Sequence, residues 1–143
     1  MLRWVVAFCL FPMLAFGQSY FEPARGTELR RNLMAAIRPH AEWNFGRPVE
    51  FVVSDLRASG DVAYASLSPQ RPGGGAIDIR TTPMYAHDQI DPEFSEGIYM
   101  HVLYQKSGDM WVAVHFSIGA TDVWFSQPDF CAIWRPVIPD YCQ

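Results

Sequence analysis

The chain has little positive charge and almost no lysine. Among its 143 residues Lys106 is the only lysine, and 11 Lys and Arg residues stand against 15 Asp and Glu residues, which gives a formal net charge of −4. Proteins that bind nucleic acid or anionic membranes by electrostatics carry a basic patch. The composition therefore argues against both kinds of partner. Half of the residues are hydrophobic, which is enough for one packed domain and too many for a disordered chain.

The sequence also has no apolar run that crosses a membrane comfortably, because a spanning helix needs about 20 residues. The N-terminal run, residues 4–16, has 13 apolar or proline residues, follows Arg3, and leads into small residues at Ala15 and Gly17. This is the pattern of an export signal peptide that is cleaved before Gln18. We therefore expect a signal peptide at residues 1–17 and a periplasmic or secreted protein; a retained anchor is the alternative.

Cysteine is scarce as well. Of three cysteines, Cys9 lies inside the predicted signal peptide, which leaves Cys131 and Cys142 in the exported chain. An even pair in an exported protein predicts a disulfide. Two thiols without histidines at zinc-finger spacing are a poor metal site, and the spacing is not the C-x-x-C of redox proteins. We expect neither a metal nor a cofactor.

The familiar catalytic motifs are missing. The sequence contains no G-x-S-x-G, no H-E-x-x-H and no G-x-x-x-x-G-K-[ST], the motifs of hydrolases, zinc proteases and phosphate-binding loops. Three successive glycines at residues 73–75 are typical of a flexible loop. Four carboxylates within residues 88–96 do not have the spacing of a calcium loop and predict a solvated acidic loop. The sequence thus holds no coherent catalytic set.

The strongest structural signal that is present is a β-hairpin around Gly108. Two runs rich in β-branched and aromatic residues, 97–105 and 110–118, flank a short gap, as in a β-hairpin. A three-residue loop at residues 106–108 aligns the purely apolar rows of the two strands, whereas a two-residue turn at Ser107 and Gly108 does not. We favour the three-residue loop. It places four residues together on the second face of the sheet: Tyr99, His101, Trp111 and His115.

The remaining patterns predict one long helix and a small antiparallel sheet. Residues 27–38 combine an N-cap at Thr27 with apolar residues at helical spacing. Pro39 ends or kinks this helix and can start a further turn through Trp43. Alternation and a capping-box-like start at Ser126 predict further elements: strands at 49–56, 62–67 and 76–82, and a short helix ending near Trp134. We therefore expect residues 18–143 to form a single α+β domain, in which the N-terminal helix packs on a four- to five-stranded antiparallel sheet and a disulfide closes the C-terminal tail.

This order of elements is similar to that of cystatin-like and nuclear-transport-factor-2-like rolls, in which a curved sheet folds over a helix. Short sequence words also resemble an uncharacterised group of small exported bacterial proteins: LMAAIRP at residues 33–39, FVVSDL at 51–56, GDVAY at 60–64 and GATD at 119–122. The resemblance covers most of the mature chain. It brings no activity with it, because a likeness of fold does not imply a function.

Three sets of residues are candidates for a functional site. His101 and His115 share the predicted second face, where histidines can bind a metal or transfer protons, but no carboxylate in either strand joins them. Asp122, after the hairpin, could act as a base in an apolar pocket or bond the backbone of a turn. The third set is an aromatic surface, since Trp and Tyr are favoured anchors at protein interfaces. Its members, beside the two histidines, are Tyr99, Trp111 and Trp124.

From these observations we expect an exported, non-enzymatic binding protein of inhibitor or immunity type, whose aromatic-rich sheet face binds another exported or cell-envelope protein. The alternative is a nuclear-transport-factor-2-like binder of small ligands, or an enzyme, with Asp122, His101 and His115 in its pocket. Neither hypothesis involves nucleic acid or a membrane span after signal cleavage. An open antiparallel sheet edge also allows a dimer.

Overall fold

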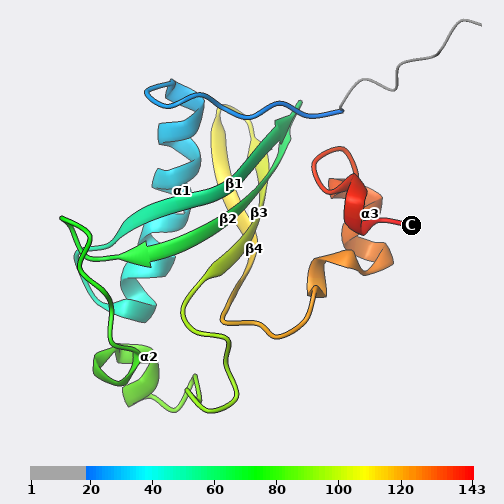
Figure 1. Ribbon diagram of the computed structural model, residues 1–143. Coiled ribbons are helices and arrows are strands. Elements are labelled where there is room, and N and C mark those ends of the chain that lie inside the picture. Colours follow the sequence, from blue (N-terminus) through cyan, green and yellow to red (C-terminus); the bar gives the residue numbers. More distant parts are fainter. Residues whose placement is uncertain (1–18) are drawn as a thin grey trace, which may run out of the picture.

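The computed structural model describes residues 19–143, and the predicted signal peptide, residues 1–17, lies outside the described residues. Figure 1 shows three layers: a long helix, an antiparallel sheet and a C-terminal helical segment. In chain order the elements are α1 (Glu28–Phe45), β1 (Glu50–Ser59), β2 (Val62–Gln70), η1 (Ile79–Thr81), α2 (Pro83–Ala86), β3 (Met100–Ser107), β4 (Met110–Ile118), η2 (Trp124–Ser126), α3 (Pro128–Trp134) and η3 (Pro139–Tyr141). The sheet order is β1-β2-β3-β4, and all neighbours are antiparallel. The predicted α+β class is confirmed.

Helix α1 begins at the predicted cap and runs past the predicted break. The Thr27 hydroxyl accepts a hydrogen bond from the Arg30 amide, which satisfies one free N–H of the first turn. Pro39 lies inside the helix and does not end it; the helix continues to its C-cap at Gly46, which has φ 77°. Burial of Ala41 and Phe45 beyond the proline stabilises the last turns against its cost. Within residues 19–143 no helix is long and apolar enough to span a membrane.

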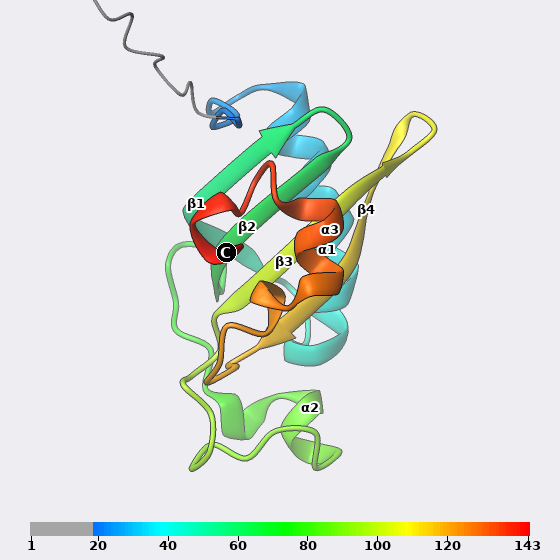
Figure 2. The ribbon, with the colours of Figure 1, turned by 90° about the vertical axis from the view of Figure 1, so that its right-hand side faces the viewer.

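The two faces of the sheet are covered by different parts of the chain. The helix face packs against α1, and small residues of β2, Ala63 and Ala65, lie in the core between them. The opposite face, which we call the C-terminal face, packs against residues 124–143 around the buried side chains of Tyr64 and Leu103. Figure 2 views the molecule from the side of this C-terminal segment, with α3 lying across the sheet.

The β3–β4 hairpin is present, but its predicted three-residue loop is wrong. Ser107 pairs with Met110, so that Gly108 and Asp109 form a two-residue turn. Gly108 has φ 59°, a conformation that favours glycine at the first position of such a turn. The turn residue was therefore identified correctly, but it occupies a different position in the loop.

A β-bulge in β4 moves Trp111 to the other face of the sheet. Ala113 pairs with Tyr104 and His115 pairs with Leu103, so Val114 between them has no partner on β3. Because a bulge adds one residue to the count, the alternation of side chains is reset across it. Trp111 consequently packs on the helix-face core, whereas His115 contacts the C-terminal segment. The prediction that Trp111 shares a face with the two histidines is wrong for this reason.

The predicted strand at residues 76–82 is also wrong, because η1 forms there instead. The Asp78 carboxylate accepts a hydrogen bond from the Arg80 amide at 3.0 Å, and the Thr81 hydroxyl donates to the Asp78 carbonyl at 2.8 Å. Such local bonds compete with the backbone pairing of a strand. The carboxylates within residues 88–96 are exposed, as expected of a solvated acidic loop.

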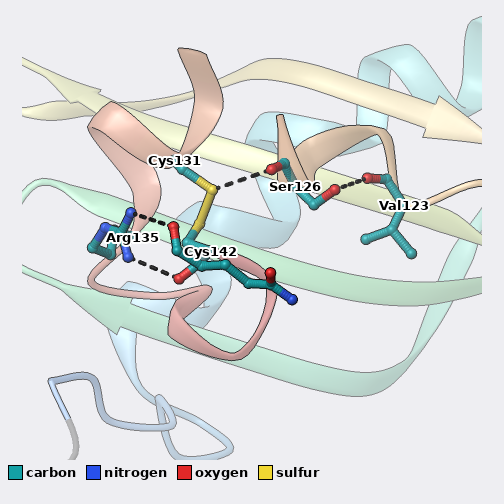
Figure 3. Close-up of a disulfide and its surroundings, with 6 residues drawn as sticks. Val123, Ser126, Cys131, Arg135 and Cys142 are labelled. Atoms are coloured by element: carbon teal, nitrogen blue, oxygen red, sulfur yellow. Dashed lines mark hydrogen bonds between the residues drawn. A yellow bond between two sulfur atoms is a disulfide. The ribbon is translucent and has the colours of Figure 1, made fainter. Parts of the chain in front are cut away.

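The predicted disulfide joins Cys131 of α3 to Cys142, with Cα atoms 5.6 Å apart. Figure 3 shows the Arg135 side chain beside this disulfide, where its guanidinium donates to the Cys142 carbonyl at 2.8 Å. Trp134 anchors the segment on the sheet: it is 2% exposed, and its indole N–H donates to the Tyr104 carbonyl at 2.8 Å. The C-terminal tail is therefore a packed third layer of the domain.

Candidate functional site

The aromatic residues predicted to bind a partner mostly contact the C-terminal segment of the same chain. The His115 ring lies 5.1 Å from the Phe130 ring and 5.6 Å from the Trp134 ring, between centroids. The Trp124 indole N–H donates to the Ser117 hydroxyl at 2.6 Å, and its ring meets Phe130 at 5.1 Å. Edge-to-face contacts of this kind stabilise packed aromatic layers. The C-terminal segment therefore covers part of the aromatic-rich face, while His115 remains exposed and Trp124 is half-buried.

Tyr99 and His101 belong to the same face and take part in hydrogen bonds within the domain. The Tyr99 hydroxyl donates to the Glu96 carboxylate at 3.0 Å, and its ring lies 5.2 Å from the His101 ring. Partial desolvation, together with the hydrogen bond to Glu96 and the charge of that carboxylate, raises the pKa of Tyr99. The tyrosine therefore remains protonated and keeps donating at neutral pH.

His101 is paired with a buried tyrosine rather than with a carboxylate. Its Nδ1 lies 2.9 Å from the Tyr64 hydroxyl. Burial raises the pKa of Tyr64, and Tyr141 and Asp55 add to the shift; burial also lowers the pKa of His101, although the charge of Asp55 opposes it. The tyrosine therefore stays protonated, and the imidazole is neutral at pH 7. In the described part of the chain no group of three or more His, Cys, Asp or Glu side chains could hold a metal.

Asp122 does not have the surroundings that a pocket base needs. Its side chain is exposed in the segment after β4, whereas a carboxylate acting as a base in a pocket needs apolar neighbours. Surface hollows of about 760 Å³ and 770 Å³ lie at the acidic loop and beside the disulfide. Neither is lined by Asp122, His101 or His115. The structure therefore does not bring the alternative catalytic residues together around a cavity.

Arg57 is a residue that the sequence reasoning missed, and it fastens the C-terminal segment to β1. Its guanidinium bonds the Asp55 carboxylate at 2.8 Å and the Asp140 carboxylate at 3.0 Å, and it lies 4.7 Å from the centre of the Tyr20 ring. Burial opposes its charge, but the bonds to the two carboxylates outweigh this and raise the pKa of Arg57. The pair of Asp55 and Arg57 at i and i+2 on one strand face was a signal that could have revealed it.

The outer edge of β4 is the surface that remains unpartnered. Within residues 19–143 no other backbone segment pairs with it. Three apolar side chains along it are exposed: Met110 by 70%, Val112 by 40% and Val114 by 41%. The strand carries no Lys, Arg, Asp, Glu or Pro, the residues with which proteins usually protect an exposed edge. Figure 2 shows the β3–β4 hairpin projecting beyond the rest of the domain.

One hydrogen bond indicates which peptide groups of β4 face outward. The Lys106 amide donates to the Asp61 carbonyl at 2.8 Å, so it points away from β4. Lys106 pairs with Trp111. Because peptide directions in an antiparallel ladder alternate in matched pairs, the N–H and C=O of Trp111, and those of Ala113 two residues on, face away from β3. These groups are available to another strand.

The other sheet edge, β1, is protected. Its sequence includes Glu50, Asp55 and Arg57, and charged side chains discourage edge-to-edge pairing. Phe21 also pairs with Ala58 near the end of β1, and the two backbone hydrogen bonds between them have N···O distances of 3.0 Å and 2.9 Å. The contrast between the two edges singles out β4 as the candidate functional site.

Comparisons with protein-family models, with curated proteins and with solved structures gave no match to this chain. The likeness to small exported bacterial proteins and to roll folds therefore stays a prediction. The candidate site rests on the geometry of β4 alone: an uncharged, apolar and unpaired strand edge on a projecting hairpin.

Proposed function

We propose that the protein is an exported, non-catalytic binding protein that acts through the outer edge of β4. The observation that supports this proposal is the unpaired edge itself, which exposes apolar side chains and carries no charge. Long apolar edges invite pairing with another chain, and natural proteins usually block them. Because the opposite edge of the same sheet is protected, the open β4 edge is the better candidate for a binding surface.

The mode of binding is addition of a strand. An extended segment of the partner pairs with the outward peptide groups of Trp111 and Ala113, and backbone hydrogen bonds supply affinity independently of the partner's sequence. Val112 and Met110 on one side of the edge, and the Trp111 ring on the other, select apolar side chains in the partner. The partner is another exported or cell-envelope protein, and binding of this kind suits an inhibitor or immunity protein that occludes its target.

This proposal replaces the aromatic sheet face by the neighbouring strand edge. The C-terminal segment then stabilises β3 and β4 through its contacts with His101 and His115 and through the bond of Trp124 to Ser117. The disulfide Cys131–Cys142 within that segment is consistent with work outside the cytoplasm, where such bonds persist.

Photo-crosslinking in living cells tests the proposal. A photoreactive amino acid replaces Val112 in one variant and Val52 in a matched control, because Val52 is a valine that is 49% exposed on the other edge strand. We expect position 112 to yield a discrete adduct with another cell-envelope protein and position 52 to yield none. Adducts at position 52 only, or no adduct with another protein at position 112, would contradict the proposed function.

A further inference from the structure

We infer that a second copy of this chain occupies the β4 edge when no other partner is present, forming an antiparallel dimer whose two-fold axis passes at Val112. The inference rests on the proposed function in one respect, namely that the edge accepts a strand. It adds that a second copy of the chain occupies this edge in the free protein, and it specifies the register of the pairing.

The outward peptide groups determine this register. Trp111 and Ala113 face outward on either side of Val112, as the Lys106 bond to Asp61 indicates. In an antiparallel pair, two residues whose groups face each other exchange both N–H···O bonds. A two-fold axis at Val112 places Trp111 of one copy opposite Ala113 of the other, and the reverse, so four backbone bonds close across the axis.

The side chains in this register are complementary in size. On the helix side, the large Trp111 ring lies opposite the small Ala113 side chain of the second copy. On the other side, Met110 lies opposite Val114, and Val112 meets its own equivalent. Apolar pairs directly across an antiparallel ladder are stabilising. In the single chain Met110, Val112 and Val114 are exposed, whereas Trp111 is half-buried and Ala113 is buried.

Charge and shape also favour the second copy. Self-pairing is destabilising when like charges meet across the axis, but β4 has no acidic or basic residue other than His115. The β1 edge is less suited to pairing with itself, because it carries the charged residues Glu50, Asp55 and Arg57. The hairpin projects beyond α1 and α3 (Figure 2), so a second hairpin can lie along it.

The paired stretch is short, because the bulge at Val114 interrupts the regular strand. We therefore expect a weak dimer, with a dissociation constant of roughly 10 µM to 1 mM, as for small interfaces. Such a dimer masks the apolar edge at high local concentration. A partner that binds β4 must then compete with the second copy for the same peptide groups.

Sedimentation velocity with charge-swapped variants tests the inference. The full chain is expressed, and the product is purified with its disulfide intact and measured from about 5 µM to about 500 µM. We expect the wild type to associate as the concentration rises. Val112→Asp places two carboxylates at the axis and should weaken association at least about tenfold, whereas Val52→Asp, at a comparably exposed valine, should change it less than about twofold.

The decisive sample is a mixture of Val112→Asp and Val112→Lys. Each variant alone repels itself, but the mixture brings opposite charges together at the axis and should restore association. A wild type that remains monomeric, a Val112→Asp variant that associates normally, or a mixture that fails to associate overturns the inference. The proposed function is tested separately: a monomeric wild type with a crosslink to another protein at position 112 retains the function and removes the dimer, and a dimer without such a crosslink does the reverse.

Discussion

Substitution of Trp134 separates the hydrogen bond from the packing that holds the C-terminal segment on the sheet. The indole N–H donates to the Tyr104 carbonyl at 2.8 Å in a buried setting. Trp134→Phe removes this donor and part of the ring, and loss of a partner to a buried polar group costs about 1–3 kcal/mol. Trp134→Ala removes the whole ring from a site that is 2% exposed, which costs about 3–5 kcal/mol. The alanine variant should therefore lose a large part of a stability of about 5–15 kcal/mol.

Urea unfolding with the disulfide intact, followed by circular dichroism, measures these free energies. The matched control is Ile133→Ala, since Ile133 is the neighbouring residue of α3 and is 45% exposed; it should lose less than about 1 kcal/mol. A Trp134→Phe variant as stable as the wild type would show that the bond to Tyr104 does not contribute. If Trp134→Ala lost no more than Ile133→Ala, the C-terminal segment would not be packed on the sheet and would not cover part of the aromatic-rich face.

Three further predictions concern single features of the fold. Gly119→Ala should cost about 2 kcal/mol or more, because Gly119 has φ 60° and an added Cβ would collide with the backbone carbonyl oxygen of Gly97. Gly60→Ala, at φ 56° with no atom within 4 Å of an added Cβ, should cost less in the same urea assay, and equal losses would contradict this. Burial lowers the pKa of His101 in the folded state, so its contribution to stability is full above its unfolded pKa of about 6.5 and is lost as the pH falls through the lower folded value. His101→Gln should therefore flatten the decline in unfolding free energy between about pH 7 and pH 5, and an unchanged slope would refute the pKa shift. Reduction of the Cys131–Cys142 bond, whose cysteines are 11 residues apart, should lower the unfolding free energy by about 2–4 kcal/mol. An unchanged free energy after reduction would show that the bond does not stabilise the domain.

Local patterns in the sequence were sufficient to predict the main elements. Leu33 and Ile37 at helical spacing identified the buried stripe of α1, and both are fully buried. The alternating runs beside Gly108 identified the hairpin, and the pairing of two cysteines identified the disulfide. These features depend on residues close together in the chain, or on a pairing with one solution, so a single sequence contains the necessary information.

The features that a single sequence did not reveal depend on contacts between distant segments. The bulge at Val114 belongs to the pairing of β4 with β3, and no residue in β4 marks it. Phe130 and Trp134 were not recognised as the cover of the C-terminal face, because an aromatic residue that packs on a sheet and one that binds a partner look the same in sequence. Arg57 lies just outside the predicted strand at 49–56, and its partner Asp140 is 83 residues further along the chain, so no local pattern reveals the contact.

Amide hydrogen exchange along β4 tests the central claim most directly, because it reports on the strand edge residue by residue. In dilute protein, the amides of Trp111 and Ala113 should exchange fast, since they face outward, while the Val112 amide, which faces β3, should exchange slowly. Raising the concentration, or adding the partner captured at position 112, should slow exchange at Trp111 and Ala113 and leave Val112 unchanged. If Trp111 and Ala113 are already protected in the dilute protein, or are unaffected when a partner binds, then the edge of β4 is not the binding surface.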